Sequence, residues 1–486
     1  MVVLVLKDLV DIVGEDFVSE RPEELYLYSK DMTENFPETP DIVVMPETTE
    51  EVQKIVLFAN KNKIPITPYV AGSNVGGLAI PYGKGILMDL KRMKKVIEIN
   101  KKDMYIVIEP GFTFGHLRKL LDEELIEFQY SFPFAPPFSS VLVNAILQGL
   151  GNLSHKYGSM SESLNGIEVV LPNGKIARAG TCAISPYWYS RTPLPDLLGL
   201  FVGWQGTTGI ATKGSICLWP KPPIITHCVV FATDPADVYN RFIFKLCRSG
   251  ICQEIGGGLL NMFMSKGLLP MEELKNLIEM MGFVPRFEGL YFVNLLTLYG
   301  NTEEEVKAKY KFLVKMVNEI NDQDGAQLVL LKPEDYGEMG QKMMTPMDLP
   351  IQIPGLLNRG GLTWVGSYVP LSKWLEGCIK GIEIHKKYDK IPGVLHRPMK
   401  SGHYGVLRFL IPFDKSNEKE IEEIRAMVKE LAEMILDIGG VIYKMPPWVA
   451  PKIMERADPG FVSLLKKIKK TLDPNGILNP HHLGFD

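Results

Sequence analysis

The chain has 486 residues, of which 46% are hydrophobic, so its composition allows large buried cores in two or three domains. Its net charge at pH 7 is −4, whereas a nucleic-acid-binding protein needs a basic face to meet phosphate. We therefore expect no nucleic-acid partner. Because no run approaches the ~18 apolar residues of a membrane span and no secretory cleavage pattern follows Met1, the sequence predicts a cytoplasmic protein without a transmembrane segment.

Strand and helix signals alternate over the first 222 residues, after a lead-in of short amphipathic helix and loop at 1–38. Apolar runs predict strands at 41–45, 64–70, 86–90, 96–99 and 106–109. Helices are predicted at 48–60, with Thr48 or Thr49 as N-cap, and at 114–125. The Asn173-Gly174 pair predicts a tight hairpin between 166–171 and 175–178.

A proline-rich stretch at 219–223 marks the predicted boundary of a second part of the chain. Beyond it the pattern predicts strands at 224–232, 290–298, 328–331 and 405–411, and helices at 234–247, 303–320 and 418–437. Ser416 or Asn417 is the expected N-cap of the last helix. The strands are short and lack the regular spacing of a doubly wound sheet, so the predicted class is α+β.

Six cysteines are present, and no two of them form a CxxC pair. We expect buried or free thiols in a reducing compartment, and no zinc site or iron–sulfur cluster. The six are Cys182, Cys217, Cys228, Cys247, Cys252 and Cys378.

A small-residue loop follows the predicted strand at 64–70 and runs through Gly72, Gly76 and Gly77. Glycine lets the backbone approach a ligand closely and lets successive N–H groups point at a phosphate oxygen. The loop is neither GxGxxG nor GxxxxGK[ST], so the Rossmann and P-loop fingerprints are absent.

Several sequence blocks occur together in one order, and the ordered set carries more information than any block alone. They are Asp41–Pro46, Ile86–Lys91, Ile108–Gly111, Val141–Ala145, Lys156–Gly158, Glu168–Gly174, Gly206–Thr212 and Leu472–Pro480. This set resembles the FAD-linked oxidase family with a PCMH-type FAD-binding domain, which includes vanillyl-alcohol oxidase, p-cresol dehydrogenase and the glycolate-oxidase-subunit-D-like enzymes. The resemblance implies an FAD-dependent oxidoreductase.

The resemblance also implies a domain plan. Residues 1–222 would form the FAD-binding domain from two α/β subdomains, residues 223–440 an α/β cap for the substrate, and residues 441–486 a segment that completes the flavin site.

The cofactor residues implied by the resemblance come from several loops. Those matched to the pyrophosphate loop are Pro68, Val70, Ala71, Gly72, Ser73, Asn74, Gly76 and Gly77. Those matched to other flavin contacts are Pro110, Gly111, Asn144, Gly149, Gly151, Gly158, Gly209, Ile210 and Asn479. Residues 64–77 contain no His or Cys, and residues 364–370 contain no His, so we predict dissociable FAD, with His155 as the residual candidate for a covalent link.

The candidate catalytic residues are also implied by the resemblance. Tyr443-Lys444 resembles a Tyr-Arg pair that binds a phenolate oxygen, although Lys444 lacks the bidentate fork of arginine. The family's Asp base has no counterpart, since residues 131–137 contain no carboxylate. His403 would accept a hydroxyl proton, and Arg397 or Arg408 would hold a carboxylate.

The leading hypothesis is hydride transfer from a para-substituted phenol or aromatic alcohol to flavin N5, by a dehydrogenase rather than an oxidase. A 2-hydroxy-acid dehydrogenase of the lactate or glycolate type, a flavin-carrying electron-transfer subunit and a non-catalytic binding module are the alternatives. Electrons would leave through an external acceptor, namely a quinone, a flavoprotein, an iron–sulfur protein or oxygen. We expect no metal site, and the protein could be a homo-oligomer. His481-His482 is expected to be a solvent-exposed pair.

Overall fold

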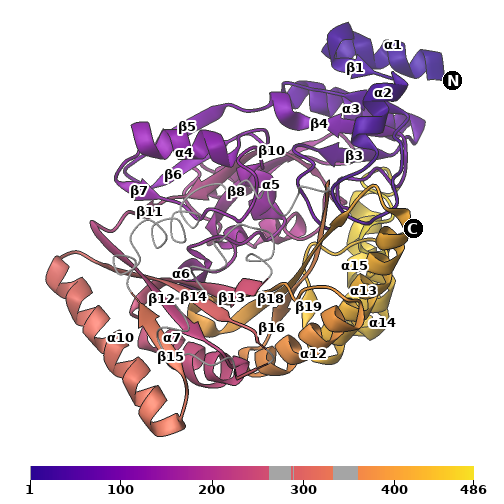
Figure 1. The fold of residues 1–486 in the computed structure, drawn as a ribbon. Helices are drawn as coiled ribbons and strands as arrows, with labels where there is room; N and C mark the ends of the chain where they lie inside the picture. The colour runs from indigo at the N-terminus through magenta and orange to yellow at the C-terminus, as the bar shows by residue number, and fades with distance from the viewer. Residues whose placement is uncertain (1, 262–285, 288, 332–359, 486) are drawn as a thin grey trace.

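The computed structural model describes residues 2–261, 286–287, 289–331 and 360–485. Within these residues the strands form sheets of four, five and eight strands and one two-stranded ribbon. The first two sheets lie together in the indigo-to-magenta part of Figure 1, and the eight-stranded sheet lies below them.

The first module is built on the four-stranded sheet, in the order β1-β2-β4-β3 with β2, β4 and β3 parallel. Helix α3 begins because the Thr48 side chain accepts a hydrogen bond from the Glu51 amide, and it ends at Lys63, which adopts a left-handed conformation. The elements are α1 (Val2–Val13), β1 (Val18–Ser19), α2 (Pro22–Tyr28), β2 (Ile42–Val44), α3 (Thr49–Asn62), β3 (Ile66–Tyr69) and β4 (Ile86–Asp89).

The second module is an antiparallel sheet in the order β5-β6-β10-β8-β9, with a core of its own under helices α4 and α5. Gly174 takes a φ of 77° in the predicted hairpin between β8 and β9. The elements are β5 (Val96–Asn100), β6 (Tyr105–Ile108), α4 (Phe114–Glu123), β7 (Phe128–Gln129), α5 (Val141–Ile146), α6 (Ser154–Tyr157), β8 (Leu164–Val170), β9 (Ile176–Gly180), β10 (Ile210–Cys217) and β11 (Trp219–Pro220).

A buried carboxylate joins the two modules. Glu168 on β8 accepts hydrogen bonds from Lys213 (2.6 Å), Arg178 (2.9 Å) and the hydroxyl of Thr49, which lies at the start of α3 (3.3 Å). Burial alone would raise the pKa of Glu168, but the bonds from Lys213 and Arg178 outweigh burial and hold it below the usual value.

We expect Glu168→Gln to lower the free energy of unfolding at neutral pH by about 1–3 kcal/mol, because it leaves two partly exposed cations without their partner. A group whose pKa is depressed in the folded state stabilises above its unfolded value and loses that contribution as pH falls. The variant should therefore also show a smaller loss of stability on acidification. Denaturant unfolding at several pH values checks this, with Glu303→Gln, which breaks an exposed ion pair, as the matched control.

The cap sheet is the eight-stranded sheet, in the order β15-β12-β14-β13-β17-β18-β16-β19. Its helices share one core with the sheet, so they cover one face and leave the other toward the two modules, as Figure 1 shows for α12 and α13. The elements are β12 (Ile224–Ala232), α7 (Ile243–Ser249), β13 (Cys252–Leu259), β14 (Phe292–Gly300), α10 (Glu303–Asp324), β15 (Leu328–Leu331), β16 (Gly360–Val369), α12 (Trp374–Lys387), β17 (Val394–Met399), β18 (Tyr404–Asp414) and α13 (Glu418–Asp437).

The predicted helix at 234–247 differs from the structure in its first half. Residues 237–242 form a π-helical segment, and regular α-helix begins only at Ile243. This wider turn accompanies a hydrogen bond between the buried Tyr239 hydroxyl and Nδ1 of His396 on β17 (3.1 Å), a long-range contact that helical periodicity does not reveal.

The end of the chain connects both parts. Strand β19 (Val441–Ile442) joins the cap sheet beside β16, and helices α14 (Ala450–Arg456) and α15 (Pro459–Leu472) follow. The chain then reaches the first module, where the Ile66 amide donates to the Ile477 carbonyl (2.7 Å) and the Asn479 amide donates to the Ile66 carbonyl (2.8 Å). Ile477 and Leu478 are part of the first module's core. Among the described helices, none is long and apolar enough to cross a membrane.

Candidate active site

A cavity lies where the two modules and the cap sheet meet, and we call it the main cavity. Its lining comes from residues 68–75, 78–79, 133–135, 139–140, 143–144, 147, 150, 364, 408 and 443–444. The loop after β3, the region of α5 and the Tyr443-Lys444 pair therefore share one space.

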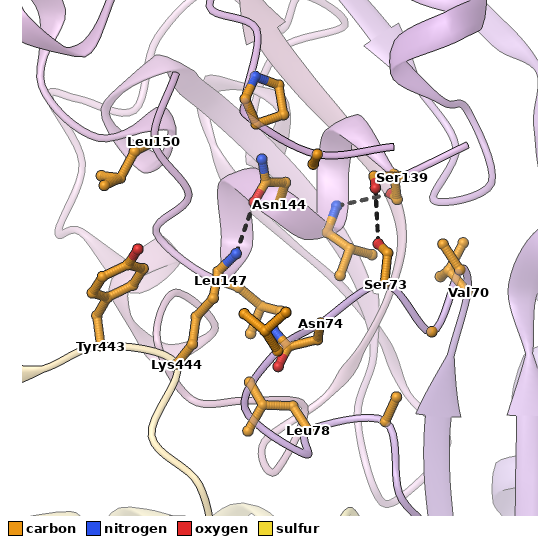
Figure 2. Close-up of a pocket in the computed structure, with 18 of the residues that line it drawn as sticks. Val70, Ser73, Asn74, Leu78, Ser139, Asn144, Leu147, Leu150, Tyr443 and Lys444 are labelled. Carbon is orange, nitrogen blue, oxygen red and sulfur yellow. Dashed lines mark hydrogen bonds between the residues drawn. The ribbon is translucent and has the colours of Figure 1, made fainter. Parts of the chain in front are cut away.

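The loop after β3 offers free backbone donors to the main cavity. Among the described residues, the amides of residues 71–75 have no hydrogen-bond partner. The loop is anchored at both ends of its turn, since Ser73 Oγ lies 2.8 Å from Ser139 Oγ and the Gly76 amide donates to Asn74 Oδ1 (2.7 Å). Figure 2 shows Ser73 directed toward Ser139. Successive free amides in a small-residue loop are a ready site for phosphate oxygens.

Two positions in this loop require glycine, one because another backbone segment lies close to it and one because of its backbone conformation. A Cβ atom on Gly76 would lie 2.5 Å from the carbonyl oxygen of Lys444, and Gly77 has a φ of 71°. The Gly77 amide donates to the half-buried Asp31 carboxylate (3.1 Å). The loop is thus packed directly against the segment that carries Tyr443 and Lys444.

Three polar side chains converge at the other end of the cavity. Arg408 on β18 donates from Nε to the hydroxyl oxygen of Tyr443 (2.8 Å), and Lys444 donates from Nζ to Asn144 Oδ1 on α5 (3.1 Å). Figure 2 shows the Lys444 side chain extending from the C-terminal segment toward Asn144. The Tyr443 ring stacks on Tyr368, with ring centroids 5.2 Å apart, and this stacking fixes its hydroxyl.

The cationic end of the cavity lacks a compensating negative charge. No Asp, Glu or His occurs among the lining residues that the structure describes, and within that part of the chain no carboxylate pairs with Lys444 or Arg408. Burial, and then the charge of Arg408, lower the pKa of Lys444 to about 7. Burial raises the pKa of Tyr443, although Arg408 opposes the shift. The site therefore favours an anionic oxygen on its ligand.

The predicted cofactor residues divide into two groups. Pro68, Val70, Ala71, Gly72, Ser73, Asn74 and Asn144 line the main cavity. Pro110, Gly111, Gly149, Gly151, Gly158, Gly209, Ile210, Asn479, Gly76 and Gly77 lie outside its lining. Several of these shape the walls: a Cβ on Gly149 would lie 2.1 Å from Asn144 Oδ1, and the Pro110 carbonyl accepts from the hydroxyl of Ser140, the N-cap of α5.

The histidines and Arg397 lie elsewhere. His403 is exposed at the end of the turn before β18. Arg397 donates from Nη1 to the Asn152 carbonyl (3.0 Å) and pairs with Glu254, so it links the cap sheet to the loop before α6. His155 is buried beside that contact, and burial lowers its pKa to about 4. None of the three lines the main cavity.

The expectation of an exposed His481-His482 pair is wrong for His482. His481 is exposed, but His482 is fully buried beside Gln205, because the chain turns inward after Pro480 through left-handed residues. Burial lowers the pKa of His482 to about 3.

Sequence reasoning missed a buried carboxyl near the site. Glu34 lines a smaller cavity, the side cavity, which shares Val75, Trp364, Tyr443 and Lys444 with the main cavity. The side chain is 4% exposed, and Oε2 has no hydrogen-bond partner among the described residues. Burial raises the pKa of this carboxyl. A Glu in a loop gives no periodic signal, so only the tertiary structure reveals it.

Comparison with known proteins places the chain in a family. Residues 40–180 match the family described as FAD binding domain, and residues 291–483 match FAD linked oxidases, C-terminal domain. The chain belongs to the FAD-linked oxidases. It is thus an FAD-dependent oxidoreductase.

Relatives of this FAD-linked oxidase span nearly its whole length. The flavoprotein subunit of 4-cresol dehydrogenase (hydroxylating) from Pseudomonas putida is 26% identical over 98% of the chain and 94% of that protein. The mitochondrial D-lactate dehydrogenase (cytochrome) from Arabidopsis thaliana is 26% identical over 96% of the chain and 78% of that protein. A structure of p-cresol methylhydroxylase with substrate bound superposes with a TM-score of 0.85 at 23% identity, covering 99% of this chain and 96% of that one. The predicted α+β fold with a PCMH-type FAD-binding domain is confirmed.

The residues present fit FAD. The free amides of residues 71–75 suit a pyrophosphate, and the main cavity continues from that loop to the Tyr443-Lys444 pair without a carboxylate in its lining. Asn144, Leu147 and Leu150 are also among the residues that line the cavity.

Proposed function

We propose that this oxidoreductase holds FAD without a covalent bond and oxidises a small organic substrate through an anionic oxygen, with a para-substituted phenol or aromatic alcohol as the leading class. The observation that carries the proposal is the convergence of Tyr443, Lys444 and Arg408 on a cavity whose described lining has no carboxylate. Non-covalent attachment is supported by the lining residues, which include no His or Cys.

The chemistry follows from the positions of these three groups. Bound FAD supplies the two-electron oxidant that accepts a hydride. Because Arg408 donates to the Tyr443 oxygen, the Tyr443 proton is free to be donated to a substrate oxygen. Two cations near that oxygen stabilise its anionic form, and a phenolate oxygen pushes electron density toward the para carbon from which hydride leaves.

We further propose that the domain boundaries lie near residues 222 and 440. The cap sheet takes its strands from residues 224–442, and the segment after 440 reaches both the cap sheet and the first module. The protein would act as a dehydrogenase that passes electrons to an external acceptor such as a quinone, a flavoprotein or an iron–sulfur protein.

A 2-hydroxy acid is the second candidate substrate. Arg408 presents a guanidinium whose described hydrogen bonds use only Nε, so its remaining donors could hold a carboxylate. D-lactate dehydrogenases among the relatives favour this class. Against it, the main cavity lining that the structure describes contains no His to take the alcohol proton.

Two experiments test the proposal: a visible spectrum of the purified protein and an anaerobic substrate screen. The spectrum, taken before and after acid precipitation, shows whether flavin is present and whether it leaves with the supernatant. We expect release into the supernatant and bleaching of the flavin by a 4-alkylphenol. Flavin that stays in the pellet contradicts the non-covalent proposal, and bleaching by 2-hydroxy acids alone favours the second candidate. Reoxidation faster with oxygen than with a quinone contradicts the dehydrogenase assignment.

A further inference from the structure

Oxidation of a hydroxyl-bearing substrate releases a proton as well as a hydride, and the protein must provide a place for that proton. The described lining of the main cavity contains no Asp, Glu or His. Arginine does not give up its proton in proteins, so Arg408 cannot accept another. Burial keeps Tyr443 protonated, because it raises the pKa of its hydroxyl. Lys444 is the remaining titratable side chain at this end of the described lining.

The surroundings of Lys444 favour a neutral amine. Its Nζ donates one hydrogen bond, to the uncharged Asn144 amide oxygen (3.1 Å), and no carboxylate lies within ion-pair distance among the described residues. Arg408 lies close enough to act on its charge. A half-buried ammonium with a cationic neighbour and a neutral acceptor loses part of the stabilisation that water would give it.

We propose that Lys444 is the proton acceptor of the reaction: its neutral amine takes the hydroxyl proton of the bound substrate and holds the resulting oxyanion as an ammonium. The step rests on the proposed function, and it balances. The substrate O–H bond breaks, an N–H bond forms on Nζ, and the hydride that follows carries both electrons to the flavin. Lys444 stands where the Tyr-Arg pair of the family has its arginine. As a lysine it can perform acid–base chemistry that an arginine cannot perform.

Other titratable groups near Lys444 act in a consistent direction. Burial and the charge of Arg408 lower the pKa of Lys444 to about 7, so the amine is largely neutral in mildly alkaline solution. Tyr443 and Tyr368 stay protonated because burial raises the pKa of both phenols. Glu34 faces the side cavity behind the Tyr443-Lys444 pair, and burial raises its pKa as well, which weakens any charge it could offer.

Binding of a phenol that cannot be oxidised separates a proton acceptor from a fixed charge. With 4-bromophenol and the FAD-loaded protein, we expect the affinity to rise about tenfold per pH unit up to pH about 7 and then to stay level until the phenol itself ionises. Above pH 7 the proton simply moves within the complex. Lys444→Arg carries a fixed cation, so its affinity should keep rising through pH 7 up to the pKa of the phenol. A wild-type curve that matches Lys444→Arg overturns the proposal.

Two controls locate the effect. Lys466→Arg makes the same change at an exposed position of α15 and should leave the binding curve unchanged. Glu34→Gln removes the buried carboxyl that lines the side cavity. In this variant the affinity for 4-bromophenol should still stop rising near pH 7. If the levelling-off near pH 7 disappears in Glu34→Gln and persists in Lys444→Arg, Glu34 is the proton acceptor and the proposal is overturned.

A ligand-free measurement distinguishes failure of this inference from failure of the phenol assignment. The rate at which acetic anhydride modifies Lys444 in the FAD-loaded protein, followed by mass spectrometry, should reach half its plateau near pH 7. A midpoint at the ordinary value for lysine, about 10.4, overturns the inference whatever the substrate is. If the midpoint is near 7 and no phenol binds, the phenol assignment fails. In that case the rate of flavin reduction by a 2-hydroxy acid should fall at acidic pH in the wild type but not in Lys444→Arg. If Lys444→Arg shows the same fall, the inference fails too.

Discussion

Arg408→Met is expected to slow flavin reduction by the substrate about 10²–10³-fold, the usual range for removal of one donor that stabilises developing negative charge. The variant removes the Nε donor to the Tyr443 oxygen, which leaves the Tyr443 proton without a fixed direction. It also removes the charge that helps to lower the pKa of Lys444. Anaerobic stopped-flow reduction measures the rate, and the visible spectrum shows that FAD is still bound.

A matched arginine and a second variant make the Arg408 result interpretable. Arg456→Met removes an arginine whose partner, Asp437, is exposed, so it should reduce flavin at the wild-type rate. Tyr443→Phe keeps the ring stacked on Tyr368 but loses the hydroxyl, and it should resemble Arg408→Met in rate. If Arg408→Met reduces its flavin at the wild-type rate, the proposal that this site stabilises a substrate oxyanion is wrong.

Gly76→Ala is expected to weaken FAD binding by roughly 1–3 kcal/mol, about 5- to 150-fold, so that the protein purifies largely without flavin. The added Cβ would lie 2.5 Å from the Lys444 carbonyl oxygen, a backbone atom that cannot rotate away. The loop that offers amides 71–75 must therefore shift. Titration of the apoprotein with FAD, followed by flavin fluorescence, gives the affinity.

A glycine with space around it serves as the control for Gly76. In Gly199→Ala the new Cβ would have only ordinary contacts, at 3.7 Å or more, and FAD binding should not change. Thermal unfolding of both apoproteins distinguishes a local change from general loss of the fold. If Gly76→Ala retains flavin as tightly as the wild type, the loop after β3 is not the pyrophosphate site.

Much of the fold follows from local signals. The caps at Thr48 and Asn417 occur where the sequence predicts them, because each capping bond joins residues three positions apart. The short strands β1 (Val18–Ser19) and β19 carry no periodic pattern of their own, and each exists only through its pairing with a distant strand. The sheet order is equally non-local, since β10 enters between β6 and β8.

Motifs in the sequence predict only part of the candidate site. The small-residue loop and the Tyr443-Lys444 pair both line the main cavity, and their assignment to a flavin site stays a prediction. Glu34, the anchor between Ser73 and Ser139, and the exposed position of His403 required the tertiary structure. Arg397 shows the same limit, because its partner Glu254 lies 143 residues away in the sequence.

The contact between Ile66 and Leu478 has a consequence for biosynthesis. The first module takes part of its core from Ile477 and Leu478, which the ribosome adds more than 250 residues after β10 is complete. Domains whose strands are contiguous can fold as they emerge, but this module must wait for the cap to be translated. The edge of β3 that pairs with Leu478 therefore has no partner until the last residues of the chain are made.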